Sequence, residues 1–268
     1  MQTGQVSWIT GASSGIGEAI SKKLAADKHK LILSARREGE LERVKSACIE
    51  MGASSDDILI LPLDIADTDA LANKVAIAQQ HFGQIDFLFN NAGISQRSFC
   101  LDTELNTYKK LFDVDVFGQI ALTKLVLPIM IKQGGGHLSV TASVAGKIGV
   151  PQRTGYCAAK HAIFGFFDAL RAETDQFNIY VSTVVPGFIR TNISKVALRG
   201  DGAEFGKTDD DIKTGMDVDM AAEKIIKGWK KHKPEIAVGK GIEMHALWLK
   251  RFFPKLMFKI AAKKANPS

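Results

Sequence analysis

A tyrosine and a lysine four residues apart are the side chains of this sequence best suited to chemistry. Tyr156 and Lys160 lie in a stretch with helical periodicity, which places their side chains on one face of a helix. A free phenol has a pKa of about 10, too high for easy proton exchange at neutral pH. A neighbouring ammonium favours the phenolate and lowers that pKa, so the pair predicts proton transfer to or from a substrate oxygen.

A serine adds a third polar group to this pair. Ser143 follows an apolar run and precedes Tyr156 by thirteen residues. Its hydroxyl could donate a hydrogen bond to a substrate oxygen. Taken alone, the three residues are equally consistent with a surface tyrosine and lysine beside a loop serine, so the prediction depends on the motifs around them.

A glycine-rich loop follows the first apolar run. It reads Thr10-Gly11-Ala12-Ser13-Ser14-Gly15-Ile16-Gly17 and opens a helical stretch. Glycines permit a tight turn and a close approach of backbone to a phosphate, and a helix N-terminus attracts the anion. The loop predicts nucleotide binding, and the alternative is an ordinary strand-to-helix turn.

Two arginines at the end of the second apolar run indicate which nucleotide. An NAD site usually places an acid there, about 20 residues past the glycines, to accept from the ribose 2′-hydroxyl. This sequence has Arg36 and Arg37 instead. Guanidinium groups pair well with a 2′-phosphate, so we expect NADP(H), with NAD(H) less favoured. The alternative is a pair of solvated arginines.

The motifs together resemble those of the short-chain dehydrogenase/reductase (SDR) family. The loop at 10–17 is followed, in the family's order, by Asn90-Asn91-Ala92-Gly93, Ser143, Tyr156-x-x-x-Lys160 and Pro186-Gly187. The likeness covers about residues 5–240. It implies hydride transfer between a nicotinamide ring and a carbonyl or alcohol carbon, with Ser143, Tyr156, Lys160 and Asp115 as the catalytic group.

The resemblance also implies a set of cofactor contacts. Asp64-Ile65 would meet the adenine, Lys160 the ribose hydroxyls, and Ile189 and Thr191 the carboxamide. Asp64 could equally be a helix N-cap, Asn90 a structural residue in a turn, and Pro186-Gly187 the turn that ends a strand. The full expected set is Gly11, Ser13, Ser14, Gly15, Ile16, Gly17, Arg36, Arg37, Asp64, Ile65, Asn90, Ala92, Gly93, Tyr156, Lys160, Pro186, Gly187, Ile189 and Thr191.

One position departs from the family pattern. The family usually carries an asparagine within Asn-x-x-Gly, where it helps to hold a water that links the lysine to solvent. Here the pattern reads Asp115-Val116-Phe117-Gly118. An ionised aspartate accepts hydrogen bonds but cannot donate them, and a nearby negative charge would raise the pKa of Lys160. We expect activity with an altered pH profile.

The elements that must position these residues alternate along the chain. Seven short apolar runs predict strands at 6–10, 31–34, 58–61, 87–90, 137–140, 180–185 and 236–238. Helical periods lie between them, for example at 71–78, 111–130 and 158–172. Continuous apolar strands alternating with helices predict a single-domain α/β fold over 1–268, a Rossmann-type doubly wound parallel sheet with helices on both faces.

Composition narrows the class of protein. The three cysteines form no metal or disulfide pattern, and no run of 18 apolar residues or signal-peptide pattern is present, so we expect a cytoplasmic protein without a spanning helix. From residue 224 onward there are twelve Lys/Arg and two acids, whereas the preceding part carries 23 bases and 27 acids. The basic excess therefore belongs to one end, and no nucleic-acid partner is expected.

The substrate side is expected in the last third of the chain. A polar, glycine-bearing stretch at about 190–216 lies where the family carries its lid, and Val150, Phe188 and Phe205 would form an apolar wall for a hydrophobic substrate. The basic, aromatic extension at about 242–265 has two open interpretations. It either closes the substrate pocket or a subunit interface, or lies as an interfacial helix on anionic lipid.

Two function classes other than a carbonyl/alcohol oxidoreductase are consistent with parts of the sequence. One is a catalytically weak NADP-binding sensor or scaffold, which Asp115 would favour and the intact Ser143, Tyr156 and Lys160 oppose. The other is a sugar-nucleotide epimerase or dehydratase, whose chains usually carry a separate C-terminal lobe. Family members commonly pair through helices that here begin near Tyr108 and Thr154, so a homodimer or homotetramer is expected.

Overall fold

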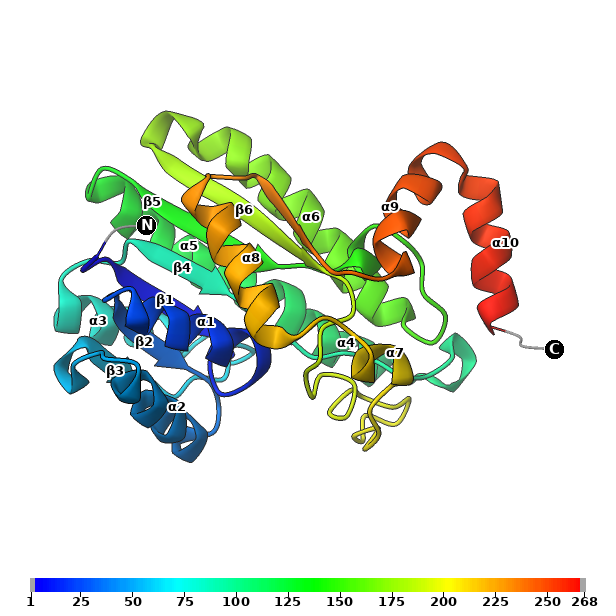
Figure 1. Ribbon diagram of the computed structural model, residues 1–268, viewed down its shortest axis with the longest axis horizontal. Helices are drawn as coiled ribbons and strands as arrows, with labels where there is room; N and C mark the ends of the chain where they lie inside the picture. The colour runs from blue at the N-terminus through cyan, green and yellow to red at the C-terminus, as the bar shows by residue number, and fades with distance from the viewer. Residues whose placement is uncertain (1–2, 266–268) are drawn as a thin grey trace.

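The seven predicted strands form one parallel sheet in the computed structural model, which describes residues 3–265 (Figure 1). The strand order is β3-β2-β1-β4-β5-β6-β7, and every neighbouring pair is parallel. The doubly wound fold is therefore confirmed. The strands are β1 Val6–Thr10, β2 Lys30–Ser34, β3 Ile58–Ile60, β4 Phe87–Asn90, β5 Gly136–Thr141, β6 Ile179–Pro186 and β7 Glu235–Val238.

Helices cover both faces of this sheet because successive strand side chains point to opposite sides. Ile9 and Leu33 pack with helices α1, α2 and α8, whereas Trp8 and Ile32 belong to the core shared with α3, α5 and α6. The longer helices are α1 Gly15–Ala26, α2 Glu38–Glu50, α3 Leu71–Phe82, α4 Leu105–Phe112, α5 Gly118–Lys132, α6 Thr154–Thr174, α8 Val218–Lys230, α9 Ile242–Phe252 and α10 Pro254–Ala265.

The chain reverses its direction of travel across the sheet between β1 and β4. From β1 the order runs outward to β2 and β3, and β4 then pairs with the other side of β1. Ligands of such sheets bind at this switch point, at the carboxyl ends of the strands. Thr10 and Asn90, the last residues of β1 and β4, therefore bring the glycine loop and the Asn90–Gly93 segment together.

A continuous helix of 28 residues, Leu105–Lys132, runs from α4 through a π-helical segment, Asp113–Phe117, into α5. By length and composition alone it is apolar enough to cross a membrane, although it contains no unbroken apolar run of 18 residues. Leu111, Leu122, Val126 and Met130 are fully buried on its sheet-facing side. We assign it to the layer that covers the sheet, because it shares the core cluster of α3 and α6.

The last two helices extend beyond the layers, although Met257 of α10 and Leu247 and Leu249 of α9 pack against the core. α9 and α10 form a hairpin beyond the carboxyl end of β7, and Figure 1 shows it projecting from the end of the molecule. The segment between β6 and α8 is mostly irregular and contains one short helix, α7 Asp210–Lys213. Of the domain expected over 1–268, residues 1–2 and 266–268 lie outside the described part of the chain.

Candidate functional site

The glycine loop has the geometry of a phosphate cradle. Gly11 and Gly15 have φ angles of +65° and +58°, a region that favours glycine. A Cβ on Gly17 would lie 2.3 Å from the Gly11 carbonyl oxygen, and one on Gly11 would lie 2.9 Å from the Cα of Ala92. The loop thus lies directly against the segment that follows β4, and neither Gly11 nor Gly17 has room for a side chain. Ser14 precedes α1, and its side chain makes no capping hydrogen bond.

An arginine that the sequence analysis missed holds this loop in place. Arg43 of α2 donates to the carbonyl oxygen of Ser13 at 3.2 Å and to both carboxylate oxygens of Glu18 at 2.8 and 2.9 Å. The Arg43 guanidinium lowers the pKa of Glu18 to about 2. Residues 25 positions apart leave no periodic signal, so only the fold reveals this contact.

Arg36 and Arg37 lie where the sequence analysis expects them, directly after β2. Both side chains are exposed, and neither guanidinium forms an ion pair or hydrogen bond with another described side chain. Asp64, after β3, is exposed, and its Oδ1 accepts from the Ala66 N–H at 3.0 Å. This carboxylate caps a turn rather than α3, which begins later, at Leu71. Its neighbour Ile65 is buried.

The end of β4 is fixed by side-chain hydrogen bonds. Thr10 Oγ1 accepts from the N–H groups of Asn91 and Ala92 at 2.9 and 3.0 Å. Asn90 is fully buried and donates through Nδ2 to Thr123 Oγ1 at 2.9 Å. Its Oδ1 is buried without a partner among the described residues. The asparagine therefore ties the central strand to α5 and keeps one acceptor unused beside the loop.

The predicted catalytic residues meet at one end of α6. Tyr156 and Lys160 are buried, with exposed fractions of 7% and 3%, and the Lys160 Nζ lies 5.6 Å from the centre of the Tyr156 ring. Lys160 Nζ donates to the carbonyl oxygen of Thr141 at 3.0 Å. Ser143 caps a 3-10 turn after β5, accepting from the Ala145 N–H at 3.1 Å, and lines the same cavity as Tyr156.

Asp115 lies directly behind the lysine. Its Oδ2 is 3.3 Å from Lys160 Nζ, in an ion pair without a directed hydrogen bond, and its Oδ1 accepts from the Ile94 N–H at 2.8 Å. Full burial raises the pKa of Asp115, while the charge of Lys160 opposes that rise. The π-helical turn that carries Asp115 places it here, and a Cβ on Gly93 would be 3.2 Å from its Oδ1.

The cavity that contains Ser143 and Tyr156 is large and mainly apolar. Its volume is about 630 Å³, and α9 and α10 form one wall of it through Trp248, Leu249 and Met257. The expected contacts Pro186, Gly187, Ile189 and Thr191 line it as well. The C-terminal extension therefore forms part of the wall of this cavity.

One part of the expected apolar wall was wrong. Val150 and Phe188 line the cavity, but Phe205 is not among its lining residues. The Phe205 N–H donates to the Ala197 carbonyl oxygen at 2.8 Å, and the guanidinium of Arg97 lies 6.0 Å from the centre of its ring. The segment folds back on itself at Gly202 and Gly206, which carries the ring away from the substrate side.

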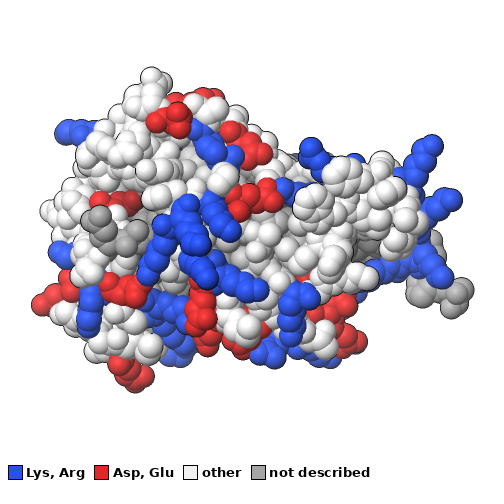
Figure 2. Space-filling model, turned by 45° about the horizontal axis from the view of Figure 1, so that its top comes forward, with Lys and Arg blue, Asp and Glu red and all other residues white. Residues whose placement is uncertain are grey.

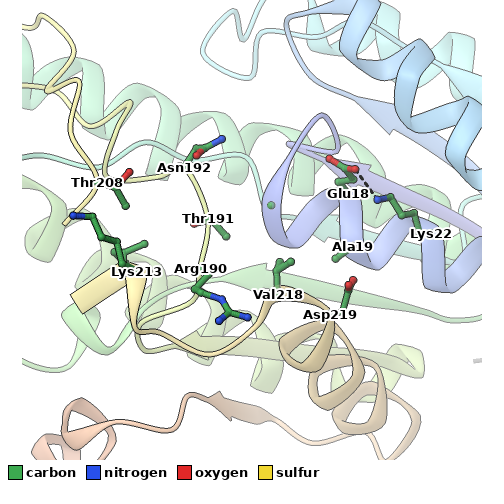
Figure 3. A pocket seen from close by; sticks show the side chains of 12 residues that line it. Glu18, Ala19, Lys22, Arg190, Thr191, Asn192, Thr208, Lys213, Val218 and Asp219 are labelled. Carbon is green, nitrogen blue, oxygen red and sulfur yellow. Dashed lines mark ion pairs between the residues drawn. The ribbon is translucent and has the colours of Figure 1, made fainter. Parts of the chain in front are cut away.

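A second cavity of about 400 Å³ lies beside the phosphate loop (Figure 3). Figure 3 shows Glu18 and Lys22 of α1 on one side and Arg190, Thr191 and Asn192 on the other. Thr191 lines both cavities, and a Cβ on Gly15 would lie 3.1 Å from its methyl group. Thr191 thus lies between the glycine loop and the cavity that Ser143 and Tyr156 line.

Asp209 holds the segment 190–216 against the catalytic side, which sequence reasoning did not anticipate. Its carboxylate pairs with Arg153, just before α6, and with Arg97 at 3.5 Å. Its N–H donates to Ser194 Oγ at 3.1 Å, and Arg153 also donates to Ser95 Oγ at 2.8 Å. The network fixes Ser194 and Asp209 of this segment beside Ser95 and Arg153, which line the cavity.

Comparison with known proteins gives the same family throughout. Residues 5–201 match the family described as short chain dehydrogenase. The chain is 41% identical over 263 residues to a Drosophila melanogaster protein named dehydrogenase/reductase SDR family protein 7-like, covering 98% of this chain and 81% of that one.

Two solved structures are similar in fold. An SDR from Burkholderia phymatum in complex with NAD superposes with a TM-score of 0.84 at 24% identity, over 99% of this chain and 97% of that one. A metagenomic short-chain oxidoreductase in complex with NADP gives a TM-score of 0.66 at 29% identity, over 70% and 85%. Both nicotinamide cofactors are thus found among similar structures.

Proposed function

The chain belongs to the short-chain dehydrogenase/reductase family of oxidoreductases, and from that premise we propose that it is an NADP(H)-dependent enzyme that interconverts a carbonyl and a secondary alcohol. The observation that carries this proposal is the burial of Tyr156 at the wall of an apolar cavity, with the buried Lys160 Nζ 5.6 Å from the centre of its ring. An inert surface pair would be exposed and would not face a cavity. Proton exchange with a substrate oxygen requires this placement.

The chain's residues divide the proton chemistry among them. In the reductive direction the Tyr156 hydroxyl donates its proton to the substrate oxygen, and the Lys160 ammonium stabilises the phenolate that forms. Ser143 donates a hydrogen bond that orients the same oxygen. Of the three donors of Lys160, one is used by Thr141, and the ion pair with Asp115 involves no directed hydrogen bond, so a donor remains for a ribose hydroxyl.

The residues of the nucleotide site fit a nicotinamide dinucleotide phosphate. When bound, the cofactor supplies or accepts the hydride. The glycine cradle and the N-terminus of α1 would hold the pyrophosphate. Arg36 and Arg37, which have no ionic partner among the described residues, would hold the 2′-phosphate. Asn90, Ile189 and Thr191 would hold the nicotinamide side. We propose a hydrophobic substrate, because aromatic and aliphatic side chains dominate the cavity wall.

The direct test is nucleotide oxidation over a panel of apolar ketones, aldehydes and steroids. We expect NADPH to be oxidised with at least some of these compounds, and NADH to support a much lower kcat/KM. Tight binding of NADPH with no turnover over the whole panel would favour the sensor or scaffold alternative.

Asp115 is expected to control the acid side of the pH profile. Because burial raises the pKa of Asp115, this residue becomes protonated, and loses the negative charge that faces Lys160, at a higher pH than an ordinary aspartate does. Asp115→Asn holds this position neutral at every pH, as protonation does in the unmodified protein, so kcat at neutral pH should fall by up to about tenfold and the acid limb that Asp115 contributes should be lost. A kcat profile from pH 4.5 to 9 checks this; superimposable profiles would contradict it. Asp113→Asn, on the same helix, is the control.

We further propose that the protein works in the cytoplasm as a homodimer or homotetramer. Tyr108 and Thr154, which mark the expected pairing helices, share a hydrogen bond of 2.9 Å. On the same helical rod Leu105 and Phe117 are 68% and 55% exposed, and a second copy would cover them. Light scattering coupled to size exclusion measures the assembly.

Peripheral contact with an anionic membrane is proposed for the outer side of the α9–α10 hairpin. Leu256 and Phe258 are 49% and 56% exposed and do not line the cavity. Lys255 and Lys259 flank them, and Lys250 lies 4.5 Å above the ring of Phe258. Figure 2 shows basic side chains projecting from this end of the molecule. Apolar side chains ringed by lysines suit the interface of a bilayer.

Replacing both apolar side chains is expected to weaken vesicle binding without affecting the cavity. Leu256→Ser/Phe258→Ser should lower the partition coefficient on phosphatidylserine vesicles by about tenfold or more, since each buried side chain contributes roughly 1.5–3 kcal/mol. Co-sedimentation measures the effect. The control is Ile49→Ser/Met51→Ser at the exposed end of α2. Equal loss in both double variants would contradict a specific lipid-binding face.

A further inference from the structure

Glu243 is a buried carboxylate at the junction between the C-terminal hairpin and the core. It lies in the first turn of α9, is 8% exposed and lines the catalytic cavity. Two backbone N–H groups converge on its Oε1, that of Phe188 at 3.3 Å and that of Gly241 at 3.2 Å. One side chain of α9 thus binds the backbone of the loop that follows β6.

The surroundings of this carboxylate leave little room for any other group. A Cβ on Gly187 would lie 2.4 Å from Glu243 Oε1, and one on Gly241 would lie 2.0 Å from Oε2. A Cβ on Gly239 would be 3.1 Å from Oε1. No Lys, Arg or His of the described chain forms an ion pair with Glu243. The side chain therefore fills a glycine-lined recess and is bound by backbone donors.

The other helix of the hairpin reaches the same loop residue from a different direction. Lys264 of α10 lies 5.9 Å from the centre of the Phe188 ring and pairs with Asp211 of α7 at 2.9 Å. The carbonyl oxygen of Phe188 accepts a hydrogen bond from the Met216 N–H at 2.8 Å. The hairpin thus meets the 186–191 loop twice, once at the backbone through Glu243 and once at a side chain through Lys264.

We propose that Glu243 is a positioning residue that couples the hairpin wall of the substrate cavity to the loop that holds the nicotinamide. The proposal rests on the proposed function, because it takes 186–191 as the cofactor loop. When a nucleotide binds the 186–191 loop, the loop and its Phe188 N–H become fixed in place. The hydrogen bond from this N–H to Glu243 Oε1 then holds α9 in place as well. Cofactor binding thereby completes the apolar wall before substrate enters. Only an oxygen at the position of Oε1 is needed, and the negative charge is not.

The substitutions separate reach from charge. Glu243→Gln keeps an acceptor oxygen at the same reach and removes the charge. Glu243→Asp keeps the charge, but its side chain is one methylene shorter and cannot meet both N–H groups. Glu243→Leu has neither. We expect the Gln variant to behave as the unmodified protein, and the Asp and Leu variants to lose the coupling while raising the Kd for NADP+ about fivefold, the effect of one lost hydrogen bond.

Trp248 reports the state of the wall. It lies on α9, lines the cavity and is 68% exposed, whereas the other two tryptophans, Trp8 and Trp229, are fully buried. Acrylamide quenching of fluorescence therefore reads Trp248, and a Trp248→Phe protein supplies the background. NADP+ is the probe, because it does not absorb the emission. The measured quantity is the fall in the quenching constant when saturating NADP+ is added.

The expected pattern is a fall in the unmodified and Gln proteins and no fall in the Asp and Leu proteins at saturating NADP+. A fall of equal size in all four proteins would overturn the proposal while leaving the proposed function intact. Loss in the Gln variant would also overturn it, because charge rather than reach would then matter. If the unmodified protein binds no NADP+ by calorimetry, both proposals fail together. Should the Leu variant not fold by circular dichroism, the Asp and Gln pair decides.

Discussion

Replacing Tyr156 by phenylalanine is expected to lower kcat by about a thousandfold, the midrange contribution of a positioned proton donor. The substitution removes one oxygen from a side chain that is 7% exposed at the cavity wall. The ring remains to pack against Ala145 and Cys157, so the fold should be retained. Lys160 keeps its bond to Thr141 and its ion pair with Asp115, and nucleotide binding should therefore change little.

The measurement is single-turnover oxidation of NADPH with whichever ketone the panel identifies, together with the Kd of NADPH by calorimetry. Tyr108→Phe is the matched control, because it also removes one phenolic oxygen, from a hydrogen bond to Thr154 outside the cavity lining. Turnover within threefold of the unmodified enzyme in Tyr156→Phe would overturn the mechanism. Equal losses of turnover in both variants would indicate a structural effect of the α4–α6 contact instead.

The strands and the order of the motifs could be predicted from the sequence because they depend on local pattern. A parallel strand that is buried on both faces appears in the sequence as a short unbroken apolar run, such as Phe87–Phe89 in β4, and this pattern predicts a strand. The glycine loop was equally readable, because positive φ and close backbone contact at Gly11 admit few other residues. These features require only information within about ten residues.

The features that the sequence did not predict all depend on distant partners. Arg43 donates to the Ser13 carbonyl oxygen thirty residues away, and Asp209 pairs with Arg153, 56 residues earlier in the chain. The sequence analysis identified Asp115, but its π-helical turn has no simple periodic signature, so its distance to Lys160 could come only from the fold. Glu243 was counted among the residues of the basic end, and nothing in its neighbourhood indicates that a loop 55 residues earlier supplies its partner.

Substituting both arginines after β2 is expected to remove most of the preference for NADPH over NADH. Arg36 and Arg37 are exposed and have no ionic partner among the described residues, so their charges are available to a 2′-phosphate. A hydrogen bond to a charged group contributes roughly 1.5–3 kcal/mol, and we take the lower end because exposed charges are screened. Loss of two such bonds in Arg36→Gln/Arg37→Gln should lower kcat/KM for NADPH by about a hundredfold.

The effect on NADH distinguishes a phosphate site from general attraction of an anion. NADH lacks the 2′-phosphate, so its kcat/KM should change by less than threefold in the double variant. Lys124→Gln/Lys132→Gln makes the same change of charge on α5, which covers the face of the sheet opposite to α2. This control should leave kcat/KM for both nucleotides unchanged. Because screening weakens exposed ion pairs, the NADPH preference of the unmodified enzyme should also fall between 0.05 and 0.5 M salt. Equal losses for NADPH and NADH in the arginine variant would place the 2′-phosphate elsewhere and remove the basis for assigning NADP(H).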